Sequence, residues 1–210
     1  IPLAFVANHG LREDQKKLSA VEQALMSGKT LSAHDQNWLA EQAENYGLSD
    51  GQYDAAFWKE MKHRMDIVPP SLIVAQMVDE SGWGTSRFAA EGNALFGQWS
   101  YKGGIKPKEQ RKSKGNYSIK AFKTPLDSVR AYMLNLNSHD VYASFRERRA
   151  TLRAEGKEVT GPALVGTLIK YSERGEAYIR NIEGIMSSND LSPLDQAKIA
   201  NGKIMYLVLK

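Results

Sequence analysis

Two adjacent acids, Asp79 and Glu80, close an apolar stretch just before the sequence Ser-Gly-Trp-Gly at residues 81–84. If this stretch is a helix, both acids lie on apolar stripes, so periodicity alone does not choose between them. Burying an ionised carboxylate is costly unless it is paired or protonated. The glycines would let the backbone turn into an open cleft directly after Glu80. This context favours Glu80 as the functional carboxyl and Asp79 as a structural neighbour.

The position of Glu80 suits acid catalysis. A helix C-terminus and apolar neighbours both disfavour the charged form of a carboxyl, so we expect the pKa of Glu80 to be raised. A general acid that operates near neutral pH needs such a pKa. The alternative is an ordinary helix-end acid that reaches solvent or pairs with Arg87.

Metal and thiol chemistry have little support in the sequence. The chain has no cysteine and four histidines. Glu60 and His63 have the Glu-x-x-His spacing of di-iron helical bundles, but no second copy of that motif is present, so we expect His63 to be structural or at the surface. We therefore predict no metal and no cofactor.

The elements that must position Glu80 are mainly helical. Apolar residues recur at helical spacing over residues 11–26, 32–46, 52–65, 70–80, 125–137, 142–154, 161–170 and 175–186. Residues 99–123 contain Gly103-Gly104, Gly115-Asn116 and partial alternation, which predicts a small β-hairpin lobe. The run at residues 203–210 predicts a strand or a docked segment.

The stretch from Pro70 to Gly97 resembles the signature of the endo-β-N-acetylglucosaminidases of glycoside hydrolase family 73, which are bacterial peptidoglycan hydrolases. It includes Glu80-Ser-Gly-Trp-Gly, Ser86-Arg-Phe, Glu91-Gly-Asn and Leu95-Phe-Gly. The spelling Leu-Phe-Gly-Gln-Trp at 95–99 and the later stretch at 129–139 are more similar to the Bax-type branch of that family. The resemblance spans roughly residues 53–188.

The resemblance implies a mainly α (α+β), lysozyme-like fold, in which a helical domain and a small β-hairpin lobe flank a cleft. It implies three parts: an N-terminal helical extension at 1–50 that packs on the core, a glucosaminidase domain at 51–190 with its β-lobe at about 99–123, and a tail at 191–210. It also implies that Glu80 is the catalytic acid. Glycoside hydrolysis usually needs a second carboxylate, which similar proteins take from the β-lobe, where Glu109 is the acid of this chain.

Further site residues follow from the same resemblance. Tyr171 matches a family tyrosine that lies beside the catalytic acid, where a phenol can hydrogen-bond a sugar or stabilise developing charge. Aromatic faces and polar side chains in the matching segments supply the predicted substrate-binding set, since aromatic rings offer apolar platforms to sugars. That set is Trp83, Phe88, Asn93, Phe96, Gln98, Trp99 and Tyr178.

The charge of the chain favours an anionic partner. The formal net charge is +4 and the sequence pI is about 9.1, and six basic residues surround Glu109 between residues 101 and 117. That loop is compatible with nucleic acid, with anionic wall polymers or with solvent alone. The motif favours wall polymers, so we expect peptidoglycan glycan strands as the partner, no nucleic acid and a monomer.

The sequence also bears on location. Its longest apolar stretch is far shorter than the roughly 20 residues of a membrane span, so we expect none. The sequence starts without Met, which favours a processed or trimmed chain that has lost a signal peptide. We expect the cell envelope, either periplasmic or secreted.

Three functions remain open from the sequence. The first is a peptidoglycan hydrolase that cleaves β-1,4 glycosidic bonds after N-acetylglucosamine. The second is a lytic transglycosylase, which forms an anhydro-sugar with a single acid. The third is a peptidoglycan-binding protein with weak catalysis, which the altered spelling of the β-lobe motivates.

Overall fold

The computed structural model describes residues 1–49, 52–100, 103–107 and 117–197, and most of these residues are helical. The helices are α1 (Pro2–Met26), α2 (Ala33–Asn45), α3 (Ala55–Arg64), α4 (Pro70–Ser81), α5 (Arg87–Gly92), α6 (Pro125–Ser138), α7 (Ala143–Ala154), α8 (Gly161–Leu164) and α9 (Glu176–Ser188). Short 3₁₀ helices are η2 (Asp140–Tyr142), η3 (Val165–Leu168) and η4 (Ser192–Asp195). The strands are β1 (Trp99–Ser100) and β2 (Ser118–Ile119).

Local sequence explains where many helices begin. A serine, threonine or aspartate stands at the N-cap and accepts a hydrogen bond from a backbone N–H of the first turn, which satisfies an otherwise unpaired donor. These caps are Ser32, Asp54, Ser86, Thr124 and Thr160. At α6 the cap is reciprocal, because Asp127 also accepts from the backbone of Thr124. Pro70 and Pro125 stand in the first turn, where a missing N–H has no cost.

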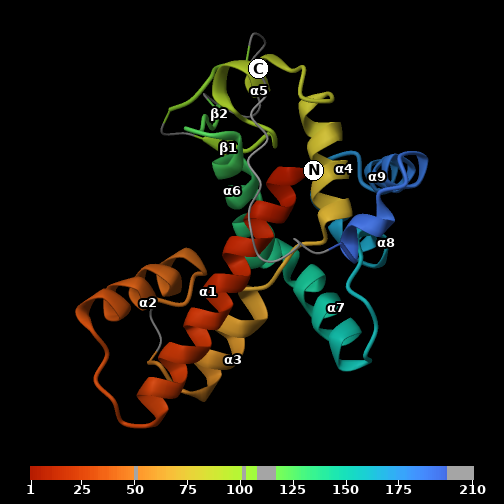
Figure 1. The fold of residues 1–210 in the computed structure, drawn as a ribbon. Helices are drawn as coiled ribbons and strands as arrows, with labels where there is room; N and C mark the ends of the chain where they lie inside the picture. Colours follow the sequence, from red (N-terminus) through yellow and green to blue (C-terminus); the bar gives the residue numbers. More distant parts are fainter. Residues whose placement is uncertain (50–51, 101–102, 108–116, 198–210) are drawn as a thin grey trace.

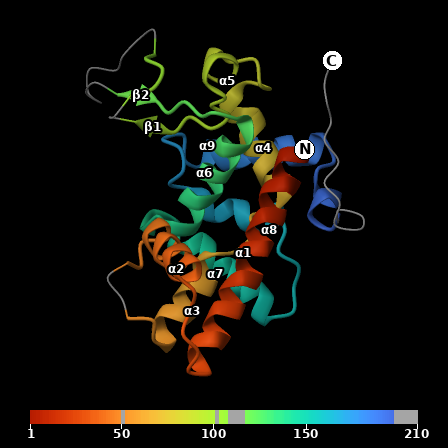
Figure 2. The ribbon, with the colours of Figure 1, turned by 60° about the vertical axis from the view of Figure 1, so that its left-hand side comes forward.

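The two strands form a small antiparallel sheet. Trp99 lies opposite Ile119, and Ile105 forms a further bridge with Ile119. Gly104 has φ +133°, and a Cβ there would lie 2.2 Å from the carbonyl oxygen of Ile119. Only glycine allows this approach of the two backbones. The sheet and α5 lie at one end of the molecule, and α1, α2 and α3 extend to the opposite end (Figures 1 and 2).

Two hydrophobic clusters support the fold. The larger one surrounds α4 and contains buried residues of α6, α7 and α9, together with Ala4 and Ala7 of α1. The smaller one joins the second half of α1 to α2 and α3, with Leu18, Leu39 and Met61 at its centre. Because α1 contributes to both clusters, it connects the N-terminal helices to the domain that holds Glu80. The predicted boundary at residue 50 stays a prediction.

The buried Arg149 of α7 connects the two clusters. Its guanidinium donates to the carbonyl oxygens of His63, Asp66 and Ile67, and to the side chain of Asn137. It also lies 3.3 Å from the Asp66 carboxylate. A buried guanidinium is tolerated when its charge and its donors are satisfied in this way. The segment between α3 and α4 is therefore fixed by contacts that come from α6 and α7.

The mainly helical class with a small sheet is confirmed. The structure differs from the sequence prediction in detail. Residues 161–170 were expected as one helix but form α8 followed by η3, and α1 begins at Pro2 rather than near residue 11. Helix α5 was not predicted, because its six residues are too short for periodicity to register. The predicted C-terminal strand lies outside the described residues.

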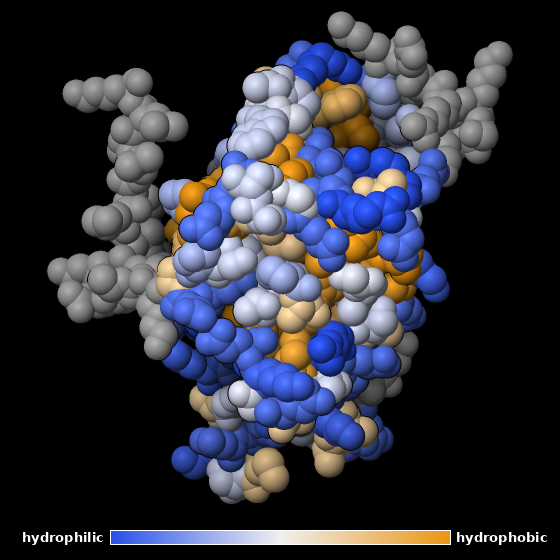
Figure 3. Space-filling model, turned by 90° about the vertical axis from the view of Figure 1, so that its right-hand side faces the viewer, coloured by the Kyte–Doolittle hydropathy of each residue, from blue (hydrophilic) through white to orange (hydrophobic). Residues whose placement is uncertain are grey.

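The surface of the face in Figure 3 is mostly hydrophilic, and its hydrophobic residues appear in small separate patches. Exposed apolar residues scattered in this way are normal for protein surfaces in water. Among the described residues, no helix combines the length and the apolar character that a membrane crossing requires.

Candidate active site

The last turn of α4 presents Glu80. The helix ends at Ser81, and Gly82 follows in the left-handed conformation with φ +55°. The Ser81 hydroxyl donates to the carbonyl oxygen of Met77 and accepts from the N–H of Gly84 at 2.8 Å. The glycine-rich sequence thus forms a fixed turn directly after Glu80, as the opening motif predicted.

A cleft of about 510 Å³ opens beside Glu80. Helix α4, the segment before β1, helix α6 and the loop between η3 and α9 all contribute to its walls. Its lining residues are Glu80, Gly97, Gln98, Trp99, Asn135, Tyr142, Tyr171, Ser172, Glu173 and Arg174. Four of the predicted site residues are therefore brought together here: Glu80, Tyr171, Gln98 and Trp99.

The surroundings of Glu80 keep its carboxyl protonated to a higher pH than usual. Burial raises the pKa of Glu80, and the neighbouring charge of Asp79 raises it further. The charge of Arg174 and a hydrogen bond from the backbone N–H of Gly97 act in the opposite direction. The balance is a raised pKa, which leaves a proton available for transfer.

Asp79 has a structural role. Its carboxylate pairs with Arg174 and accepts a hydrogen bond of 2.6 Å from the side chain of Asn181 in α9. These contacts hold the loop after η3 and helix α9 against the end of α4. Arg87, the alternative partner considered for Glu80, instead lies 3.1 Å from Glu91 and donates to the carbonyl oxygen of Lys106.

Aromatic rings form the floor behind Glu80. The ring of Tyr171 stacks on Tyr178 with centroids 5.4 Å apart and meets the rings of Tyr132 and Tyr142 edge-on or tilted. Burial raises the pKa of Tyr171 well above its ordinary value, and the nearby Glu80 is the next cause. The Tyr171 hydroxyl therefore stays a proton donor throughout the physiological pH range.

Two predicted substrate-binding residues belong to the core instead. Phe96 and Tyr178 are both fully buried. Phe96 stacks on Tyr132 at 4.0 Å, and the Tyr178 hydroxyl accepts a hydrogen bond of 2.6 Å from Gln76. Substrate contact stays a prediction for both residues, whose rings pack in the core, where burial of a large aromatic side chain stabilises the fold.

Three other predicted contacts lie outside the cleft lining. Asn93 ends α5 in the left-handed conformation and donates to the carbonyl oxygens of Phe122 and Lys123, so it joins α5 to the chain after β2. Phe88 is half-buried on α5 beneath the Arg87 guanidinium. Trp83 is 67% exposed on the turn after α4. Asn93 and Phe88 thus support the local fold, and substrate binding by these three residues stays a prediction.

Of the three remaining predicted site residues, the structure describes Trp99 and Gln98 but not Glu109. Trp99 is 44% exposed, stacks on Tyr117 at 4.8 Å and lines the cleft. Gln98 lies beside it and is half-buried. Glu109, the predicted second carboxylate, lies outside the described residues.

Besides Gly97, whose motif was noted but which was not predicted to line a site, sequence reasoning missed five residues of the cleft. They are Asn135, Tyr142, Ser172, Glu173 and Arg174. The last three directly follow Tyr171, so the same motif was a signal for them. The Tyr142 hydroxyl is hydrogen-bonded with Asn135, and Asn135 lies in the Bax-like stretch at 129–139. Across the ranges that the structure describes, no group of three or more His, Asp or Glu side chains could hold a metal ion.

Comparisons with known proteins agree with this geometry. A family model named Glucosaminidase, described as mannosyl-glycoprotein endo-beta-N-acetylglucosaminidase, matches residues 55–191. Protein bax of Escherichia coli (strain K12) is 42% identical over 121 residues, which are 58% of this chain and 43% of that protein. The chain thus spans less than half the length of this relative, and no solved structure matches it. The family match covers α3 to α9, including every element that forms the cleft, so the chain belongs to the Glucosaminidase family.

Proposed function

We propose that the protein hydrolyses β-1,4 glycosidic bonds of peptidoglycan after N-acetylglucosamine, with Glu80 as the general acid. The observation that carries this proposal is the half-buried carboxyl of Glu80, with its raised pKa, in a cleft that could hold a sugar chain. A carboxylic acid in that position donates its proton to the leaving oxygen of an oxocarbenium-like transition state.

The other walls of the cleft support binding and charge stabilisation. Trp99 presents an aromatic face at one side, which suits a sugar ring. On the opposite side the Tyr171 hydroxyl lies near Glu80 and can donate to a sugar oxygen. The Arg174 guanidinium forms an ion pair with Asp79 and not with Glu80. It therefore positions the loop between η3 and α9.

The direct test is Glu80→Gln, assayed by the release of reducing sugar from purified cell walls. We expect loss of activity with an unchanged circular dichroism spectrum, because the amide keeps the shape of the side chain but cannot donate a proton in this way. Glu91→Gln is the matched control, since Glu91 is an exposed acid on α5 that pairs with Arg87. Retained activity in Glu80→Gln would contradict the assignment.

Two acids are candidates for the second carboxylate. Glu109 is the prediction from the sequence, and Glu173 is the further acid that lines the cleft with Glu80. The variants Glu109→Gln and Glu173→Gln separate the two candidates. Replacing the carboxylate that activates water by an amide should lower the activity of the enzyme by roughly 100-fold or more. A cleft with one essential acid keeps its activity in both variants.

Retained activity in both variants would leave Glu80 as the single essential acid, and a single acid favours a lytic transglycosylase. Mass spectrometry of the soluble products decides between the two reactions. Hydrolysis gives a reducing N-acetylglucosamine end, whereas a transglycosylase gives a muramic acid end that is lighter by one water. The substrate also leads us to propose a location in the cell envelope, which fractionation of native cells would test.

A further inference from the structure

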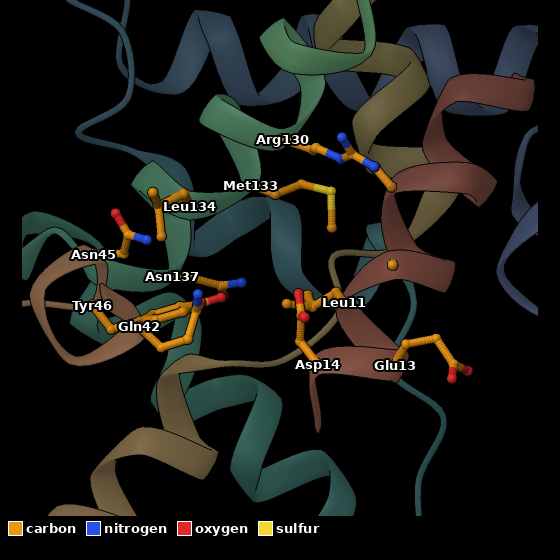
Figure 4. A pocket seen from close by; sticks show the side chains of 12 residues that line it. Leu11, Glu13, Asp14, Gln42, Asn45, Tyr46, Arg130, Met133, Leu134 and Asn137 are labelled. Atoms are coloured by element: carbon orange, nitrogen blue, oxygen red, sulfur yellow. The ribbon is translucent and has the colours of Figure 1, made fainter. Parts of the chain in front are cut away.

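A second hollow lies between α1, α2 and α6 and has a volume of about 490 Å³ (Figure 4). Arg130, Met133, Leu134 and Asn137 line it from α6, on the face of that helix opposite to Asn135, which lines the catalytic cleft. Helices α1 and α2 form its other walls, and both precede the residues that the family model matches. The hollow is therefore separate from the cleft, and half of it is built outside the family domain.

The lining of this hollow combines apolar and polar groups in the manner of a small-molecule site. Leu11, Met133 and Leu134 provide apolar surface, and Gln42 and Asn45 of α2 carry side-chain amides, with Asn45 beside Leu134 (Figure 4). Pockets for small ligands typically have volumes of about 300–1,000 Å³ and a few convergent polar groups on an apolar lining. A volume in the lower half of that range suits a ligand of about two amino-acid residues.

Asp14 is the central polar group of the hollow. Its carboxylate points from α1 into the space between the three helices (Figure 4). It is half-buried, and no residue of the described ranges forms a hydrogen bond or ion pair with it. The neighbouring Glu13 also lines the hollow, but its carboxylate is directed away from the centre and pairs with Lys16 at 2.7 Å (Figure 4). A half-buried carboxylate without a partner is costly, so a ligand that brings a cationic donor gains by supplying one.

Arg130 of α6 brings the opposite charge into the same hollow. Its guanidinium lies over Gly10, where a Cβ would be 3.9 Å from Nη2. Its own ion pair, with Asp127 one turn away on α6, is 4.0 Å long, and the Arg130 side chain is 55% exposed. Burial raises the pKa of Asp14, and the nearby charges of Arg130 and Lys17 oppose this rise, although neither forms an ion pair with Asp14 in the described residues. The carboxylate of Asp14 on α1 and the guanidinium of Arg130 on α6 are thus oppositely charged groups that are not paired with each other.

We propose that this hollow binds a short zwitterionic peptide, with the ammonium group at Asp14 and the carboxylate at Arg130. Charge-assisted hydrogen bonds to a carboxylate and to a guanidinium are the strong contacts in such a complex. The amides of Gln42 and Asn45 can pair with the peptide bond, and the apolar wall accepts a small side chain. The inference does not depend on the catalytic activity, because none of these residues lines the catalytic cleft.

The test uses the full chain and three probes: alanyl-alanine, its N-acetylated form and its C-terminal amide. Titration followed by ¹H–¹⁵N NMR should move resonances of α1, α2 and α6 with free alanyl-alanine. Each capped probe should bind roughly tenfold more weakly, because each loses one charged contact. If the capped probes bind as tightly as the free peptide, or if none binds at tens of millimolar, the proposal is overturned.

Variants assign each end of the peptide. Asp14→Asn should abolish the preference for a free amino group, and Arg130→Gln should abolish the preference for a free carboxylate. Glu13→Gln is the control, because it removes an acid of the same helix whose carboxylate is directed away from the centre of the hollow. Glu80→Gln should bind like the wild type, which separates this proposal from the proposed hydrolase. Unchanged preferences in both Asp14→Asn and Arg130→Gln would refute the assignment.

Discussion

The catalytic cleft and the hollow between α1, α2 and α6 contain similar groups in different circumstances. Each has a partly buried carboxyl with a raised pKa, caused first by burial: Glu80 in the cleft and Asp14 in the hollow. Each carboxyl also has a tyrosine near it: burial raises the pKa of Tyr171 and of Tyr46, and the charges of Glu80 and Asp14 respectively raise it further. The hollow therefore resembles the cleft in composition.

The two sites differ in the contacts that surround the carboxyl. In the cleft, Asp79 engages the nearest guanidinium, that of Arg174, and the backbone of Gly97 contacts the Glu80 carboxyl. In the hollow, Asp14 has no such contact within the described residues, and Arg130 remains half-exposed. Fixed neighbours suit proton transfer, which depends on a defined geometry. Charges without fixed partners suit a ligand that arrives with charges of its own.

The largest expected effect tests this contrast directly. Glu80→Gln should lower kcat for wall hydrolysis by about 10²–10⁴-fold, the usual contribution of a general acid. Asp14→Asn should leave the rate within about twofold, since Asp14 does not line the cleft in which the reaction takes place. Reducing-sugar release measured on the two purified variants decides. Equal losses would mean that the hollow acts in the same reaction.

The two tyrosines give the next effect. Tyr171→Phe should lower kcat by roughly 10- to 100-fold, because the cleft loses a hydroxyl donor near the reacting acid. Tyr46→Phe removes the corresponding hydroxyl of the hollow and should not change kcat. The measurement is the same assay, together with melting temperatures to exclude unfolding. If kcat fell less in Tyr171→Phe than in Tyr46→Phe, the prediction that only the tyrosine of the cleft takes part in catalysis would be contradicted.

Two glycines allow a finer test. A Cβ at Gly97 would lie 3.3 Å from Oε2 of Glu80, whereas one at Gly10 would make an ordinary contact with Arg130. Gly97→Ala should displace the carboxyl and lower kcat about fivefold to tenfold, since small misplacements are costly in catalysis. Gly10→Ala, inside helix α1, should stabilise the protein by about 0.5–1 kcal/mol and leave kcat unchanged. Steady-state kinetics and urea denaturation measure both effects.

The smallest effect concerns stability and pH. Because the folded pKa of Glu80 is raised, its neutral form stabilises the fold at low pH, and this contribution is lost as pH rises through the folded pKa. Glu80→Gln should therefore exceed the wild type in stability at pH 7, by roughly 0.5–2 kcal/mol, and match it below about pH 4. Asp14→Asn should follow the same direction with a smaller gain, because Asp14 is less buried. Urea midpoints at several pH values test this, and a variant that is less stable than the wild type at pH 7 would contradict it.

The sequence by itself determined the local features of this protein. Apolar periodicity predicted most helices, because residues three and four apart lie on the same face of a helix. The same local logic placed Glu80 at the end of a buried helix before a glycine turn. The sequence motif that begins at Tyr171 was recognised as well, but Glu173 and Arg174 were not predicted to line the cleft.

Only the tertiary structure decided which side chains face a ligand. Phe96 and Trp99 are neighbours in sequence, yet one is fully buried and the other is 44% exposed. The Asp79–Arg174 pair joins positions 95 residues apart, and Asp14 faces Arg130 only because α1 packs against α6. Such contacts depend on how helices pack, and the spacing of residues along the chain does not encode that directly. The sequence therefore predicted Glu80 as the acid, whereas the residues that line the catalytic cleft and the hollow were determined by how the helices pack.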